Sequence, residues 1–109
     1  MLDTFDAQNK VDENGNPAGG YARGTGMAIE WQNGPLGRGA ERQEPTGAFV
    51  ETVLAAVRQR IEFYQTAQNK KFACRENAIA ITKIEEAMMW LDSRTKAREV
   101  RQVEGTHTA

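Results

Sequence analysis

Two groups of polar side chains in the second half of the sequence have types and spacing suited to binding chemistry. Asn77 interrupts an otherwise apolar helical pattern, and a buried amide is costly unless it is paired. Asn77 either sets the register of packed helices or reads a base edge or ribose hydroxyl. Arg94, Arg98 and Arg101 are three or four residues apart, so they share one side of a helix. They either form a solvated basic helix end or clamp phosphate and stack on purines.

The spacing between these groups limits how one ligand can meet them. Asn77 and Arg94 lie 17 residues apart, which is roughly 25 Å along an α-helix. No small ligand reaches both positions within one chain. If both residues contact the same molecule, the pocket lies between subunits.

Catalytic groups are harder to assemble from this sequence. His107 is the only histidine and Cys74 the only cysteine, and neither has an evident catalytic partner. Glu85 and Glu86 are adjacent, so on a helix they point about 100° apart and do not form a paired acid and base. We therefore expect a binding protein and not an enzyme, with no catalytic residue, no metal ligand and no cofactor.

The distribution of charge suggests a small anionic ligand. The net charge is −1, whereas domains that bind nucleic acid polymers are usually strongly basic. Residues 1–20 carry one lysine and four acids, while residues 69–101 carry eight basic and five acidic side chains. The second region therefore suits a localised anion.

Two further features indicate where the chain resides. A single cysteine fits a reducing cytosol, and the acidic N-terminus lacks the apolar run of a secretory signal. The sequence also has no stretch of about 18 apolar residues, which a membrane-spanning helix would need. We expect a cytoplasmic protein that contacts neither a membrane nor a nucleic acid polymer.

Glycine and proline divide the sequence near residue 46. Nine of the ten glycines and all three prolines fall between Gly15 and Gly47, a composition typical of turns and short strands. We predict a flexible tail over residues 1–20 and a single domain over residues 21–109. The domain's expected segments are short strands and loop over 21–45, a helix over 46–68, a helix over 74–102 and a C-terminal tail over 103–109.

One short strand stands out in the glycine-rich part. Met27–Trp31 alternates between apolar and smaller or polar side chains, as a half-buried strand does. Asn33-Gly34 follows at once, and this dipeptide favours a hairpin turn. The partner strand lies either at Tyr21–Arg23 or after Pro35; the sequence does not choose between them.

After residue 46 the apolar residues recur with the spacing of an α-helix. The first helix has an apolar stripe formed by Val50, Val53, Leu54, Val57, Ile61 and Tyr64. The second helix has a seam formed by Asn77, Ile81, Ile84, Met88, Leu91, Thr95 and Arg98. A short polar connection between two long amphipathic helices predicts an antiparallel hairpin.

The predicted fold class is α+β: a short β-hairpin or small antiparallel sheet, then a long antiparallel two-helix hairpin. Ile79, Met89 and Trp90 lie outside the seam of the second helix. One partner helix cannot cover them, so we expect a second surface to be buried between subunits of a homo-oligomer.

The second helix resembles a known family. The run KFACRENAIAITKIEEAMMWLDSRTK at residues 71–96, continued by residues 98–106, resembles the helical-hairpin domain of phage anti-defence sponges. These are the anti-Thoeris and anti-CBASS proteins, which take up bacterial immune signals. The glycine-rich segment before the hairpin is similar to the anti-Thoeris branch.

The resemblance implies a protein that binds cyclic nucleotides and releases them unchanged. Members of the anti-Thoeris branch sequester glycocyclic ADP-ribose, and family members also take cyclic di- or trinucleotides. They assemble as dimers that gather into hexamers, with ligand pockets between subunits.

The resemblance also implies individual ligand contacts. Asn77 and Arg94 match an asparagine and an arginine that contact ligand in the anti-Thoeris branch. An aromatic ring near the hairpin corner is expected to stack on adenine, and Phe72 fills this role, with Tyr64 as the second choice. Arg42 corresponds to a further arginine from the glycine-rich segment.

A second type of pocket would draw its polar contacts from the C-terminal region, from Arg98, Arg101 and Gly105–Thr106. The alternative function is a structural or protein-binding helical hairpin whose arginines pair with acids of another protein. Only the sponge should melt at a higher temperature when a cyclic nucleotide is added.

Overall fold

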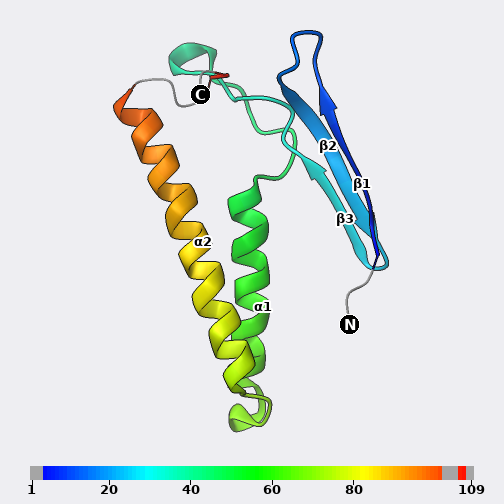
Figure 1. Cartoon of the computed structure of the whole chain (residues 1–109), viewed down its shortest axis with the longest axis vertical. Coiled ribbons are helices and arrows are strands. Elements are labelled where there is room, and N and C mark those ends of the chain that lie inside the picture. The colour runs from blue at the N-terminus through cyan, green and yellow to red at the C-terminus, as the bar shows by residue number, and fades with distance from the viewer. Residues whose placement is uncertain (1–3, 102–105, 108–109) are drawn as a thin grey trace. The chain divides into compact units, whose positions relative to one another are not determined.

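The computed structural model describes residues 4–101, 106 and 107. Its elements are β1 (Asp6–Val11), β2 (Pro17–Gly24), β3 (Met27–Trp31), a 3-10 turn (Gly39–Glu41), α1 (Val50–Lys70) and α2 (Arg75–Val100) (Figure 1). A three-stranded antiparallel sheet followed by two helices confirms the α+β class. The chain divides into two compact units: one combines the strands with the residues from Arg98 on, and the other is Val50–Ala97. The single domain expected over residues 21–109 is thus shared between two units.

The sheet is a simple meander in the order β1-β2-β3. A tight turn joins β1 to β2, in which the Asp12 carboxylate accepts hydrogen bonds from the backbone N–H groups of Asn14 (2.8 Å) and Asn16 (3.0 Å). The bond from Asn16 is the main cause that lowers the pKa of Asp12 below its usual 3.8. A two-residue turn at Thr25–Gly26 joins β2 to β3, and Gly26 has a φ of +72° that favours glycine.

The prediction of a flexible tail over residues 1–20 is wrong for most of that segment, since β1 and half of β2 lie within it. The six residues of β1, DAQNKV, are all exposed. Because none of them packs in a core, the sequence has no apolar alternation that would indicate a strand. Backbone pairing from Asp6 opposite Arg23 to Val11 opposite Pro17 forms the strand instead. Low hydrophobicity is therefore a poor guide to an edge strand that buries no side chain.

Strand β3 has the predicted bounds, and its partner is the earlier of the two candidates. Asn33-Gly34, the expected hairpin turn, follows the strand as a bend, while Thr25–Gly26 makes the turn. Ala22 faces Ile29 across the two strands, and Ala22 and Gly20, both in β2, are the only buried residues among those the structure describes. The sheet therefore has a very small core of its own.

Gln32 closes the long loop that follows β3. Its side-chain oxygen accepts hydrogen bonds from the backbone N–H groups of Thr46 (2.7 Å) and Gly47 (3.0 Å), and a parallel bridge pairs Trp31 with Ala48. A Cβ atom on Gly47 would lie 2.5 Å from the carbonyl oxygen of Trp31, so only glycine permits this approach. The two ends of the loop between residues 33 and 45 are thereby held together.

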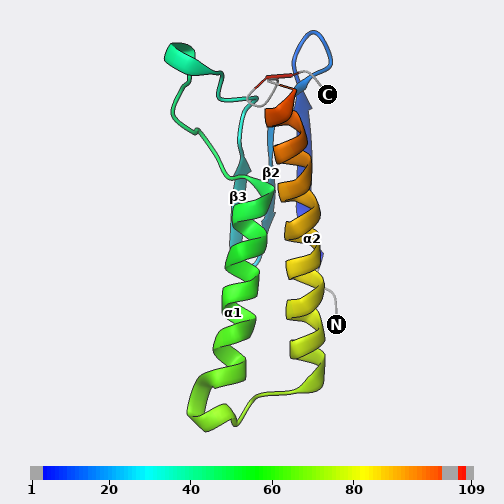
Figure 2. The same cartoon turned by 90° about the vertical axis from the view of Figure 1, so that its left-hand side faces the viewer.

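The two helices form an antiparallel hairpin (Figure 2). Helix α1 begins four residues later than expected, and residues 67–69 at its end are not helical. Helix α2 matches its predicted range of 74–102 to within two residues at either end. No helix in the described part of the chain is both long and apolar enough to cross a lipid bilayer.

The seam predicted for α2 is confirmed. Each of its seven positions is partly buried, and Ala80 is the only other partly buried residue of the helix. The spacing of four and three residues therefore identifies the side of α2 that faces α1. Neither helix has a fully buried residue, so the hairpin by itself leaves even this seam half-covered.

The stripe predicted for α1 is wrong at three positions. Val50, Val57 and Tyr64 are exposed, while Arg58 and Gln65 take inward positions. Sequence periodicity missed these two because both are polar. Their contacts explain the placement: Arg58 Nη2 lies 3.1 Å from Glu85 Oε2 of α2 and 2.9 Å from Glu62, and Gln65 bonds to the backbone of Cys74.

Candidate ligand-binding site

Asn77 lies in the first turn of α2, where its placement is set by the residues just before it. Cys74 acts as the N-cap: its sulfur accepts a hydrogen bond from the Asn77 backbone N–H (3.4 Å), and its carbonyl accepts one from Ala78 (3.2 Å). The Asn77 side chain is partly buried and forms no hydrogen bond within the described part of the chain. Its amide therefore has the full donor and acceptor capacity of an asparagine available to a ligand or to another chain.

Phe72 lies in the connection between the helices, about half-exposed at 51%. The Lys71 ammonium is 5.4 Å from the centre of its ring. The ring thus has an accessible face next to a positive charge, which suits an aromatic base that is linked to phosphate. Phe72 and Asn77 flank the Cys74 cap, so one local structure carries both of these predicted contacts.

Tyr64, the second choice for stacking, belongs to a cluster on α1. The Arg60 guanidinium lies 4.9 Å from the Tyr64 ring centre and 5.2 Å from that of Phe63, and its Nε donates to the Tyr64 hydroxyl at 3.1 Å. The two rings are 6.0 Å apart. Both candidate rings have a cation beside them, but Tyr64 is the less exposed, at 39% against 51%, and its hydroxyl is already bonded, which favours Phe72 for the stacking role. The spacing of an arginine followed three and four residues later by aromatics could have indicated it.

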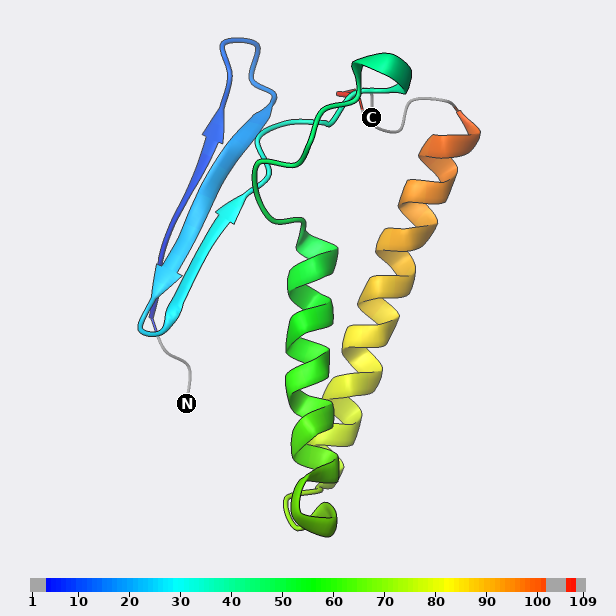
Figure 3. The same cartoon turned by 180° about the vertical axis from the view of Figure 1, so that it is seen from behind.

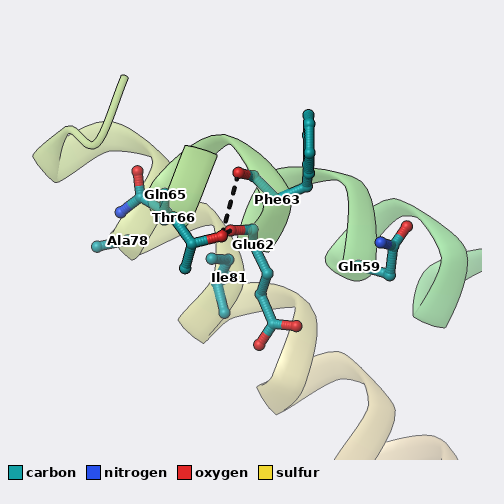
Figure 4. A pocket seen from close by; sticks show the side chains of 7 residues that line it. All are labelled: Gln59, Glu62, Phe63, Gln65, Thr66, Ala78 and Ile81. Carbon is teal, nitrogen blue, oxygen red and sulfur yellow. Dashed lines mark hydrogen bonds between the residues drawn. The ribbon is translucent and has the colours of Figure 1, made fainter. Parts of the chain in front are cut away.

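An open groove lies between α1 and α2 near the closed end of the hairpin (Figure 4). Its volume is about 650 Å³, within the range of small-molecule sites. It is lined by Gln59, Glu62, Phe63, Gln65, Thr66, Ala78 and Ile81. None of the predicted ligand contacts is among these residues. The Thr66 hydroxyl in the groove is already bonded to the carbonyls of Glu62 and Phe63, both at 3.3 Å.

Arg94 is exposed on the same helix as Asn77. It forms no ion pair or hydrogen bond within the described residues, in contrast to Lys96, whose Nζ lies 3.0 Å from Asp92. Because α2 is one continuous helix from Arg75 to Val100, the separation of roughly 25 Å between Asn77 and Arg94 stands. The structure does not bring these two residues together within one chain.

The structure brings together some of the C-terminal residues that are predicted to form a second pocket. Arg98 is partly buried, and its Nη2 donates to the carbonyl of Thr106 at 2.6 Å. Arg101 is exposed in the turn that ends the helix. Gly105 lies outside the described residues. Of the residues predicted for a second pocket, Arg98 and Thr106 are therefore in direct contact.

Arg42 follows the 3-10 turn and is exposed. Together with Arg38, Gly39 and Glu99 it lines a small cavity of about 180 Å³. Two guanidinium groups and one carboxylate leave this cavity with a net positive charge, which suits an anion. Arg38 was not predicted from the sequence. The four-residue spacing of two arginines in a glycine-rich loop is the signal that could have found it.

Among the described residues, no group of three or more histidine, cysteine, aspartate or glutamate side chains is arranged to hold a metal ion. The arrangement provides amide, guanidinium and aromatic groups. These groups recognise bases, phosphates and ribose by hydrogen bonding, charge and stacking.

Comparison with known proteins shows what the chain is similar to. The family described as "Acb2/Tad1, hairpin domain" matches residues 26–96. Over 79 residues the chain is 46% identical to a protein named "Thoeris anti-defense 1" from Bacillus phage SBSphiJ7. This match covers 72% of the chain and 51% of the relative, so the chain spans about half the length of that protein. The family match includes Arg42, Phe72, Asn77 and Arg94 and ends before Arg98.

Proposed function

Because the chain belongs to the Acb2/Tad1 hairpin-domain family, we propose that it is a phage-type anti-defence sponge. It binds a cyclic nucleotide immune signal and holds it without cleaving it. The proposed ligands are glycocyclic ADP-ribose and cyclic di- or trinucleotides. The name of the relative, "Thoeris anti-defense 1", supports an anti-defence role and favours glycocyclic ADP-ribose as the first ligand to test.

The observation that carries this proposal is the pair Asn77 and Arg94 on α2, inside the family match. The Asn77 amide reads a base edge or a ribose hydroxyl, and Arg94 binds a phosphate in a charge-assisted contact. Phe72 stacks on adenine, which its exposed ring allows. Arg42 adds positive charge from the loop after β3.

The proposed pocket lies between subunits. Asn77 and Arg94 are too far apart for one small ligand to reach both in a single chain, at roughly 25 Å. Asn77 of one copy and Arg94 of another therefore face the same ligand in a homodimer. The absence of buried residues in both helices supports association, and dimers gather further into hexamers.

A second type of pocket is built around the C-terminal end of α2. Arg98, Arg101 and Thr106 supply its polar contacts, and the bond between Arg98 and the Thr106 carbonyl supports their belonging to one site. This pocket takes a cyclic di- or trinucleotide, whose several phosphates match more than one arginine.

The sponge acts without a cofactor or a metal, as a non-enzymatic protein in the cytoplasm of the infected cell. Its partners are the signalling nucleotide and other copies of itself, not a nucleic acid polymer or a membrane. Sequestration works by lowering the free concentration of the signal, so the protein must bind tightly but needs no catalytic group.

The test is a titration of the wild-type protein with glycocyclic ADP-ribose, a cyclic dinucleotide and a cyclic trinucleotide by calorimetry. The protein is then denatured and the released ligand is analysed by chromatography. Binding with recovery of intact ligand is expected. A cleaved product would contradict sequestration, and a chain that associates but binds none of the three would instead be a structural module.

A further inference from the structure

The connection between α1 and α2 has a backbone conformation that its residues do not favour. Gln68, Asn69 and Lys70 have φ values of 47°, 53° and 68°. Asparagine tolerates this left-handed region, but glutamine and lysine rarely enter it because their Cβ atoms crowd the backbone. Three such residues in succession persist only when the surrounding structure holds them, and strain of this kind is concentrated at functional sites.

The connection between α1 and α2 lies at the closed end of the helical hairpin (Figure 3). The Gln65 side chain supplies a contact that holds this connection. Its Nε2 donates to the carbonyl of Cys74 at 3.1 Å, and its Oε1 accepts from the Cys74 backbone N–H at 2.9 Å. One side chain thus satisfies both backbone groups of a residue nine positions away. Only the full amide of glutamine or asparagine presents a donor and an acceptor side by side, and the shorter asparagine would lie one methylene further from Cys74.

The residue that Gln65 holds is the one on which the site depends. Cys74 caps α2 through its bond to the Asn77 N–H, and Phe72 lies two residues before it. A free connection would sample many conformations, and the ligand would then have to order Phe72 and the start of α2 on binding. Fixing Cys74 orders both before the ligand arrives.

We infer that Gln65 is a positioning residue: its two bonds to Cys74 hold the strained connection in one conformation and so preorganise Phe72 and Asn77 for the ligand. This inference rests on the proposed function. Gln65 does not contact the ligand itself; it acts through the Cys74 backbone that it holds. Binding is tighter because Phe72 and the start of α2 are already ordered before the ligand binds.

The experiment compares Gln65→Ala with a matched control, Gln59→Ala, a glutamine of the same helix without a bond to the connection. Hydrogen exchange of the Cys74 amide reports the contact itself, a thermal melt reports the fold, and calorimetry with glycocyclic ADP-ribose reports binding. We expect Gln65→Ala to speed exchange at Cys74 and to weaken binding about five- to thirty-fold, the effect of losing one or two modest contacts. Gln59→Ala should leave both unchanged.

A rescue variant separates positioning from general stability. Gln68→Gly removes a Cβ from a left-handed residue without changing the charge. Added to Gln65→Ala, it should recover part of the lost affinity, because glycine adopts the same backbone with less strain. If Gln65→Ala does not fold, Gln65→Glu takes its place, since it keeps the acceptor for the Cys74 N–H.

The outcomes decide between the two claims. Faster exchange at Cys74 with unchanged affinity would overturn the positioning role and leave the proposed function intact. Weaker binding in Gln65→Ala that Gln68→Gly does not restore at all would assign the loss to something other than backbone order, and would also overturn it. A wild-type protein that binds no cyclic nucleotide would overturn the proposed function, and the positioning role with it.

Discussion

The sheet and the helical hairpin are held together by different kinds of interaction. Backbone ladders join the three strands, and Gly20 and Ala22 of the central strand are buried. In the hairpin no residue is buried, and individual side-chain bonds link the helices, such as Arg58 with Glu85. The hairpin also leaves Trp90 and Met89 exposed, at 65% and 59%. The sheet therefore depends mainly on its own backbone pairing, whereas we expect a partner to cover the apolar surface of the hairpin.

The largest effect is expected in the sheet, from Gly20→Ala. A Cβ at this position would overlap the carbonyl oxygen of Gln8 on β1, so the strands could pair only after the backbone moved. We expect a loss of about 3 kcal/mol in stability, at the upper end for an overpacked site. Denaturant unfolding followed by circular dichroism measures it. Gly15→Asn is the control, because that glycine has nothing within 4 Å and asparagine tolerates its positive φ.

The next largest effect is expected on the association of the helical hairpin with other copies. Trp90→Lys or Met89→Glu should lower the mass measured by light scattering or else unfold the chain, because a charge would replace an apolar contact between copies. Ser93→Lys, an exposed polar position on the same helix, should leave the mass unchanged. A wild-type protein that behaves as a stable monomer of 12.1 kDa would contradict the dependence on association.

A smaller and more local effect is expected from Arg94→Ala. The side chain is exposed and lacks a partner among the described residues, so its loss should not change the melting temperature. Binding of glycocyclic ADP-ribose should weaken by roughly 10- to 150-fold, since a charge-assisted contact is worth about 1.5–3 kcal/mol. Equal affinities in calorimetry would remove Arg94 from the site.

The smallest effect concerns the turn between β1 and β2. Backbone N–H groups lower the pKa of Asp12 below its usual 3.8. Its carboxylate therefore contributes stability above that unfolded value, and this contribution is lost as pH falls through the lower folded pKa. When the pH is lowered from about 5 to about 3, the melting temperature of the wild type should fall slightly more than that of Asp12→Asn. Identical losses would show that the turn does not depend on the charge.

The two regions also differ in how far their sequences predict them. The α2 seam was predicted residue by residue, because side-chain spacing alone decides which side of a helix packs. The α1 stripe failed where Arg58 and Gln65 turn inward, since their reason is a bond to a distant partner. Strand β1 was missed because its pairing uses only the backbone.

The candidate site follows the same division. Asn77 could be selected as a polar residue in an apolar seam and Arg94 as one of three arginines on one side of a helix, while their pairing through a 17-residue spacing is implied by the family resemblance. Their roles as ligand contacts stay predictions. Gln65 could not, because its role depends on the fold of a connection that brings Cys74 next to it. Arg38 was missed for a similar reason: loop geometry places it beside Arg42.

The central claim is that the Asn77 amide serves a ligand and not the packing of the helices. It is tested most directly by one titration and one thermal melt on Asn77→Ala. As a ligand contact, its loss leaves ligand groups unpaired at a cost of about 1–3 kcal/mol, so binding of glycocyclic ADP-ribose should weaken about 5- to 150-fold with an unchanged melting temperature and oligomeric mass. Unchanged affinity with a lowered melting temperature would contradict the claim and make Asn77 a register-setting residue.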